Sequence, residues 1–175
     1  MSKIDIQGTP IKDLKHTLDD YVNKYVAFLE QDPQKLALSI KQLDYLIQEH
    51  GTSSVQQELY RGVKSQSEIA RLFSLFDYKL ANPDQAVIYR PGRLTSTTTT
   101  QDVIQKHYGT SCQLEIEIPQ SHGNSTVKML EVNKALSAND FSFQEEVLFP
   151  SDVEFEILSL YFKDGIPIFK VRLNN

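Results

Sequence analysis

The chain has 175 residues and a mass of 20.0 kDa, which fits one domain of roughly 100–200 residues. Hydrophobic residues make up 40% and charged residues 23%, so the composition is that of a globular protein and long disorder is not expected. The formal net charge of −5 argues against binding to duplex nucleic acid, because proteins that bind by neutralising phosphates are normally basic.

Features that the sequence lacks limit where the protein works. No apolar run approaches the roughly 20 residues that a membrane-spanning helix needs, and the start of the chain has no signal-peptide pattern. The single cysteine, Cys112, excludes an internal disulfide and a cysteine-rich metal site, and the four histidines have no pair at metal-ligand spacing. We therefore expect a cytoplasmic protein with neither a membrane partner nor a metal.

The front of the chain has helical patterns. Apolar residues recur at helical spacing over Ile11–Leu29, directly after the start signal Thr9-Pro10. A second stripe over Leu36–Ile47 follows Asp32-Pro33, and Gly51 marks its end. These patterns predict two helices.

A third helix is predicted further along. Ser65 and Glu68 have the capping-box spacing ahead of the apolar stripe Ile69–Phe76. We expect a single domain over 1–175, with a helical front at 1–57 and a strand-rich core at 58–175.

The pattern changes after Pro83, where short β-branched and apolar runs predict strands. The single runs are Val87–Tyr89, Leu94–Thr100, Leu114–Ile118, Val127–Val132 and Glu146–Phe149. Val153–Phe162 and Ile166–Leu173 flank Lys163-Asp164-Gly165, which predicts a hairpin with a tight turn. Pro167 favours an edge position for the second arm. Helices followed by mostly antiparallel strands indicate an α+β domain.

Two of these segments carry polar groups that suit the binding of a charged ligand. Arg61, next to Gly62 at a predicted strand end, can present its guanidinium fork to a phosphate. Ser96 and Thr98 would share one face of a strand, where their hydroxyls can orient a carboxylate or a sugar. The alternatives are an ordinary surface strand end and a polar strand selected for β-propensity.

A third segment precedes Pro150. Gln144 and Glu146 lie two apart and would share one face of a strand. Phe141 and Phe143 fall in the turn before them, and an exposed aromatic there is unfavourable unless it meets a partner. The alternative is that both phenylalanines fill the core.

Taken together, these segments resemble the signature of one enzyme family. Tyr60-Arg61-Gly62, Leu94–Thr98 and Gln144–Pro150 are similar in order and spacing to the Arg, Ser-Thr-Ser and Glu motifs of mono-ADP-ribosyltransferases. The pattern is closest to clostridial Rho-modifying exoenzymes, insecticidal binary-toxin components and phage transferases. The resemblance implies an α+β fold in which N-terminal helices pack on a mostly antiparallel two-sheet core.

The resemblance also implies roles for single residues in NAD-dependent transfer without a metal. Glu146 would stabilise the positive charge that develops on the nicotinamide ribose. Ser96 would hold Glu146 and that ribose, and Arg61 would bind the diphosphate. The remaining NAD-binding positions implied by the motifs are Tyr60, Gly62, Thr97 and Thr98.

The residues before Glu146 bear on the acceptor. Gln144 occupies a position where arginine-modifying members carry a second glutamate, and an amide can both donate to and accept from another amide. We therefore expect an asparagine-like group on a target protein, which Phe141 and Phe143 would help to recognise. The middle motif reads Ser-Thr-Thr rather than Ser-Thr-Ser, which keeps the hydroxyl.

A second arginine competes for the phosphate role. Tyr89-Arg90 also reads Tyr-Arg, but the family separates the arginine from the serine motif by a helix. The predicted helix over Ser65–Phe76 does this only for Arg61. Arg90 and Arg93 remain candidates for contacts with phosphate or with the target.

Two other functions remain open. A guanine-directed transferase acting on nucleic acid or nucleotide would also suit a glutamine, although the negative net charge disfavours a polyanionic acceptor. A non-catalytic interaction module is expected to lose Arg61, Ser96 or Glu146, and all three are present. A delivered toxin, a phage protein and an endogenous regulator all fit the sequence.

Overall fold

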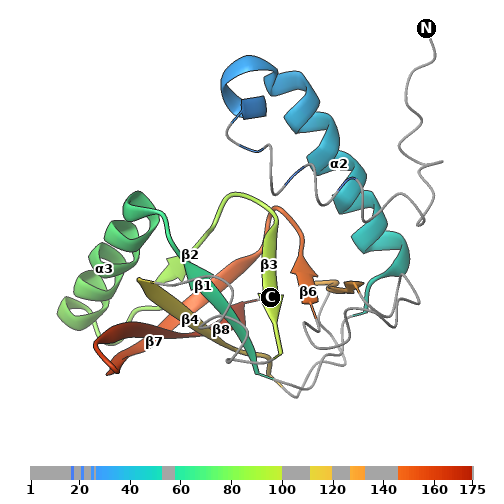
Figure 1. Cartoon of the computed structure of the whole chain (residues 1–175). Coiled ribbons are helices and arrows are strands. Elements are labelled where there is room, and N and C mark those ends of the chain that lie inside the picture. Colours follow the sequence, from blue (N-terminus) through green and yellow to red (C-terminus); the bar gives the residue numbers. More distant parts are fainter. Residues whose placement is uncertain are drawn as a thin grey trace, which may run out of the picture.

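The structure, a computed structural model, describes residues 17, 21, 25, 27–52, 58–99, 111–119, 127–132 and 146–174. In this part of the chain, helices and an eight-stranded sheet form an α+β domain (Figure 1), which confirms the expected class. The strands are β1 (Leu59–Val63), β2 (Ile88–Tyr89), β3 (Thr95–Thr98), β4 (Cys112–Glu117), β5 (Leu130–Glu131), β6 (Glu146–Phe149), β7 (Glu154–Lys163) and β8 (Ile166–Asn174).

Two helices begin where the sequence predicts, at Asp32 and at Ser65, whereas the start predicted at Thr9-Pro10 lies outside the described residues. Residues 17, 21, 25 and 27–31 are helical, within or next to the first predicted stripe. Helix α2 (Pro33–His50) starts at Asp32, whose side chain accepts a 3.1 Å hydrogen bond from the Lys35 amide. Gly51 ends it, and a Cβ at that position would lie 2.3 Å from the Ile47 carbonyl oxygen, so only glycine fits. Helix α3 (Gln66–Ala81) is capped by Ser65 and runs beyond the predicted stripe.

The sheet has the strand order β2-β7-β8-β4-β1-β3-β6-β5. It is mixed, because β4 and β8 are parallel while the other neighbours are antiparallel. We call β2-β7-β8-β4-β1 the large half and β3-β6-β5 the small half. One register pair, Tyr60 with Thr98, joins β1 to β3, and we call this junction the seam. The strands thus form one hydrogen-bonded sheet where two were expected.

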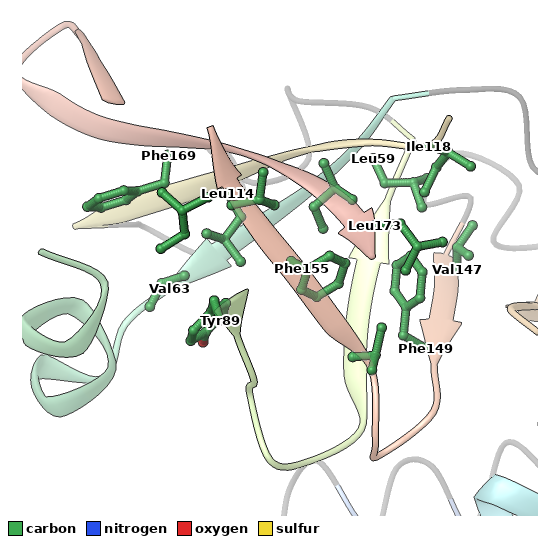
Figure 2. Close-up of a cluster of buried hydrophobic side chains, with 14 of the residues drawn as sticks. Leu59, Val63, Tyr89, Leu114, Ile118, Val147, Phe149, Phe155, Phe169 and Leu173 are labelled. Atoms are coloured by element: carbon green, nitrogen blue, oxygen red, sulfur yellow. The ribbon is translucent and has the colours of Figure 1, made fainter. Parts of the chain in front are cut away.

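The main core lies between the two halves of the sheet. Phe155 of the large half and Phe149 of the small half meet edge to face, with ring centroids 5.4 Å apart, and Figure 2 shows both within one buried cluster. Helix α3 closes this core from the large-half side, where Phe73 packs on Phe169 at 5.1 Å. Contacts across the core explain why the two halves keep a fixed arrangement despite the narrow seam.

A second core joins α2 to the outer side of the small half. Leu43, Leu46 and Ile47 of α2 are fully buried and form one cluster with Leu148 of β6. Asp44 adds two hydrogen bonds to Ser151, one to the backbone N–H at 3.0 Å and one to the hydroxyl at 2.6 Å. The helical front therefore supports the strand that begins with Glu146.

The C-terminal hairpin confirms its predicted turn and corrects its predicted place. Asp164 and Gly165 have φ angles of 52° and 78°, the left-handed pair that a tight two-residue hairpin turn requires. The edge position inferred from Pro167 is wrong, since β8 lies between β7 and β4. Proline is tolerated because the β4 pairing starts only at Ile168, so no amide is needed at Pro167 on that side.

Candidate active site

Strand β1 carries Arg61 to the place where the two halves of the sheet separate. Leu59 and Val63 are buried in the main core, and Arg61 shares their face because side chains alternate along a strand. β1 and β3 pair at the seam and diverge beyond it (Figure 1). Across this divergence the Arg61 Nη1 atom donates a 3.1 Å hydrogen bond to the Ser96 carbonyl oxygen. A side chain thus continues the link where the backbone ladder stops.

Arg61 lies in a desolvated, mixed-charge environment. Burial lowers the pKa of its guanidinium, Glu68 opposes that change, and Arg93 adds to it. Arginine nevertheless stays protonated in proteins, so a positive charge is held here with little water. The Nε atom is buried and has no hydrogen-bond partner among the described residues. A buried donor without a partner is unfavourable, and an anionic ligand that accepts from it would remove that penalty.

Ser96 and Glu146 meet on neighbouring strands. Thr98 pairs with Glu146, and Ser96 pairs with Leu148, so Ser96 and Glu146 are diagonal neighbours on one face of the small half. The Ser96 hydroxyl donates a hydrogen bond to Glu146 Oε2. Both residues are half-buried. The carboxylate is thereby held in one orientation by a hydroxyl from the next strand.

Arg61, Ser96 and Glu146 therefore form a continuous chain of contacts. The guanidinium touches the Ser96 backbone, and the Ser96 side chain touches the carboxylate. The sequence analysis singled out the same three residues from three separate segments. A fixed cation and a fixed carboxylate at one edge of the seam can bind a ligand that has both an anionic and a developing cationic part.

The other motif residues divide between this site and its surroundings. Thr98 lies on the face of Ser96 and is buried, whereas Thr97 faces the opposite way and its hydroxyl donates a 2.7 Å hydrogen bond to the Val147 carbonyl. Tyr60 faces away from Arg61, and its hydroxyl donates to Glu58 at 3.1 Å. Gly62, on the same face as Tyr60, is half-buried.

Arg90 and Arg93 have different surroundings. Arg90 is exposed and forms an ion pair with Glu154 at 2.5 Å. Arg93 places its guanidinium 4.9 Å from the centre of the Tyr25 ring and lies close enough to lower the pKa of Arg61. Of these two candidates for a supporting phosphate contact, Arg93 is the one on the Arg61 side.

Three predicted site residues lie outside the described part of the chain. They are Gln144, Phe141 and Phe143, which the sequence analysis assigned to target recognition. Their roles stay predictions.

Tyr21 is one site neighbour that the sequence analysis missed. It is 5% exposed, its hydroxyl has no partner among the described residues, and burial raises its pKa to about 12. The positive charges of Arg93 and Arg61 oppose this rise of the pKa. On the sequence it is one more residue of a helical region, and no local signal distinguishes it.

Glu68 and Tyr89 are two further neighbours whose role was not anticipated. The Tyr89 hydroxyl donates a hydrogen bond to the Glu68 carboxylate, and both residues act electrostatically on Arg61. The sequence showed Glu68 only as part of a helix cap and Tyr89 only as half of a Tyr-Arg pair. The fold brings both to the guanidinium.

Solved structures of ADP-ribosyltransferases share this fold. C3stau2 from S. aureus, determined with NAD, has a TM-score of 0.61 at 18% identity, covering 98% of this chain and 91% of that chain. Plx2a, a toxin from Paenibacillus larvae, has a TM-score of 0.61 at 14% identity over 95% and 87%. At such low identity, the similarity defines only the class of fold. That class is the ADP-ribosyltransferase fold.

A third similar structure is larger. HopU1, an ADP-ribosyltransferase of Pseudomonas syringae pv. Tomato, has a TM-score of 0.58 at 20% identity over 85% of this chain, which spans 58% of the HopU1 chain. No protein-family model and no curated protein matches the sequence. The fold therefore rests on three-dimensional similarity.

Two kinds of feature are absent from the described residues. They contain no group of three or more His, Cys, Asp and Glu side chains placed to hold a metal ion. They also include no helix whose length and hydrophobicity would let it cross a membrane.

Proposed function

We propose that this protein is a mono-ADP-ribosyltransferase that cleaves NAD and transfers ADP-ribose to a macromolecule. The observation that carries the proposal is the contact chain from Arg61 through Ser96 to Glu146, within a fold shared with ADP-ribosyltransferase toxins. Neither the fold nor the motif residues alone would be sufficient. One fold hosts many functions, and the motif residues could have been far apart in the structure.

Among the three connected residues, Arg61 suits the diphosphate of NAD. The buried Nε of Arg61 has no hydrogen-bond partner in the described part of the chain, and a guanidinium can give two charge-assisted hydrogen bonds to phosphate oxygens. Arg93 supplies a second positive charge nearby. A half-buried cation with an unpartnered Nε donor thus fits the most strongly charged part of the substrate.

Glu146, at the other end of these contacts, suits the reacting ribose. Breaking the bond between nicotinamide nitrogen and ribose C1′ leaves positive charge on the ribose, because nicotinamide departs with the bonding electrons. Glu146 would stabilise that charge, and its hydrogen bond from Ser96 keeps it in place without reorganisation. The acceptor nitrogen would supply the electron pair for the new bond to C1′ and release its proton to water.

A direct test is nicotinamide release from NAD by the purified protein. We expect slow release by the wild type and a loss of at least about a hundredfold in Glu146→Ala, the usual effect of removing one well-aimed electrostatic group. Glu156→Gln on β7 is the matched control, because it changes a half-buried carboxylate of the large half, and we expect full activity. Absence of release by the wild type under all conditions would favour an interaction module instead.

We propose an asparagine-like group on a target protein as the acceptor, because Gln144 can pair with an amide through both its donor and its acceptor atoms. Gln144→Ala is expected to keep NAD hydrolysis and to lose transfer. Equal loss of both activities would mean that Gln144 serves the cleavage step.

Labelled NAD added to a cell lysate would identify the class of acceptor. Label that is removed by protease and resists nuclease is the expected result. Label that is removed by nuclease would instead establish the guanine-directed alternative.

A further inference from the structure

A part-buried hydrogen bond between Tyr89 and Glu68, two residues that act electrostatically on Arg61, has no role in the chemistry described so far. Tyr89 of β2 is fully buried in the main core, where Figure 2 shows it near Val63 of β1. Its hydroxyl donates to the carboxylate of Glu68, in the first turn of α3. A half-buried carboxylate is thus fixed by an aromatic side chain from the edge strand of the large half.

Glu68 is the negative charge with the strongest influence on Arg61. Burial lowers the pKa of Arg61 most, and Glu68 is the largest opposing cause. Within the described part of the chain, however, no ion pair joins Glu68 to Arg61, in contrast to Arg90–Glu154 and Arg172–Glu117. Arg61 donates to the Ser96 carbonyl, and its Nε has no partner among the residues that the structure describes. The carboxylate of Glu68 thus acts electrostatically on Arg61 without pairing with it.

The other nearby cation is already engaged. Arg71, three residues after Glu68 on α3, places its guanidinium 5.2 Å from the centre of the Tyr89 ring. Its Nη2 atom donates to the Arg90 carbonyl oxygen. If the Glu68 carboxylate lost the Tyr89 hydroxyl, Arg61, whose Nε has no partner among the described residues, would be a cation able to receive it.

We propose that Tyr89 is a positioning residue whose hydroxyl holds the Glu68 carboxylate away from Arg61 and so keeps the guanidinium available for the substrate diphosphate. The inference rests on the proposed function. It assigns Glu68 the role of a competing anion near the phosphate site, restrained by one hydrogen bond. A carboxylate that turned to Arg61 would pair with it at short range in a poorly solvated place, and the diphosphate would have to displace it.

The test is NAD binding measured by isothermal titration calorimetry, together with the kcat and KM of nicotinamide release. Tyr89→Phe removes the hydroxyl and keeps the ring. We expect its Kd and KM for NAD to rise about tenfold, the lower range for a hydrogen bond to a charged group, with kcat nearly unchanged. The double variant Tyr89→Phe/Glu68→Gln should restore wild-type affinity, because the competing charge is gone.

Two further variants complete the experiment. Tyr78→Phe is the matched control, since the Tyr78 hydroxyl also hydrogen-bonds a side chain, that of Gln85 at 2.9 Å, but on the exposed end of α3; its NAD affinity should equal the wild type. Glu68→Gln alone should bind NAD at least as tightly as the wild type. This single change leaves the core intact and tests the competing role even if Tyr89→Phe does not fold.

The outcomes separate this inference from the proposed function. A wild type that binds no NAD contradicts the proposed function itself. A wild type that binds NAD while Tyr89→Phe binds equally well overturns the positioning role, as does a double variant that stays as weak as Tyr89→Phe, because a merely loosened core would not be rescued by Glu68→Gln. A tenfold weaker Glu68→Gln would likewise overturn it, since Glu68 would then support binding.

Discussion

The two halves of the sheet are built differently. The large half contains the long hairpin of β7 (10 residues) and β8 (9 residues), and long ladders join β7, β8, β4 and β1, with one register shift between Ile157 and Ser159. The small half has strands of four, four and two residues and depends on α2, which packs on its outer side. Both halves pack in the main core, but the large half has the longer strands and ladders, whereas the small half has short strands and packs on α2 as well.

This difference shows where a ligand site can arise. Each half contributes part of the candidate site, Arg61 from the large half and Ser96 with Glu146 from the small half, and they meet at the seam. Backbone pairing between β1 and β3 stops there, so backbone N–H and C=O groups and side chains become available to a ligand. Packing on both sides keeps the two halves in place, so no further hydrogen bonds between β1 and β3 are needed at the site.

The largest effect is expected from removing the contact between the two halves in the core. Phe155→Ala should lower the free energy of unfolding by about 3–5 kcal/mol, as for other buried aromatic truncations, because Phe155 is fully buried against Phe149. Urea denaturation followed by near- and far-ultraviolet circular dichroism measures this. One shared transition is expected, and two separate transitions would mean that the halves are independent folding units.

A smaller effect is expected when the cation at the seam loses its shape and keeps its charge. Arg61→Lys should raise the KM for NAD about tenfold or more, because lysine cannot give the planar fork of hydrogen bonds. Arg90→Lys is the matched control: Arg90 is exposed and pairs with Glu154, so its KM should stay near the wild type. A reversed pattern in steady-state kinetics would assign the phosphate role to Arg90.

The smallest effect is expected within the small half. Ser96→Ala removes the hydroxyl that orients Glu146 and should reduce kcat about tenfold, the lower range for a hydrogen bond to a charged group. Thr97→Val provides a contrast, because the Thr97 hydroxyl bonds the Val147 carbonyl inside the core. That change should reduce stability while kcat is kept. Equal kcat values for Ser96→Ala and the wild type would contradict a role of the Ser96 hydroxyl in catalysis.

Local signals explain which parts of the fold the sequence predicts well. The starts of α2 and α3 depend on caps within three residues, Asp32 and Ser65, and the hairpin turn depends on Asp164-Gly165. These interactions are complete within a few residues of chain. The edge position predicted from Pro167 was wrong because a missing amide prevents a hydrogen bond to only one of the two neighbouring strands. Which strands lie beside β8 is decided by contacts between residues far apart in the sequence.

The candidate site divides in the same way. Arg61, Ser96 and Glu146 were singled out because their motifs resemble a family, and the fold brings them together. Glu68 and Tyr89 were not, because their roles depend on the burial and charge around Arg61. A pairing between a helix start and an edge strand leaves no spacing pattern in a single sequence.

The most direct test of the whole account is a crystal structure of the protein with NAD. We expect the diphosphate within hydrogen-bond distance of Arg61 Nε and the nicotinamide ribose beside the Glu146 carboxylate, with Ser96 still donating to Glu146. NAD bound away from the seam, or with its diphosphate held by Arg90 and Arg61 untouched, would contradict it.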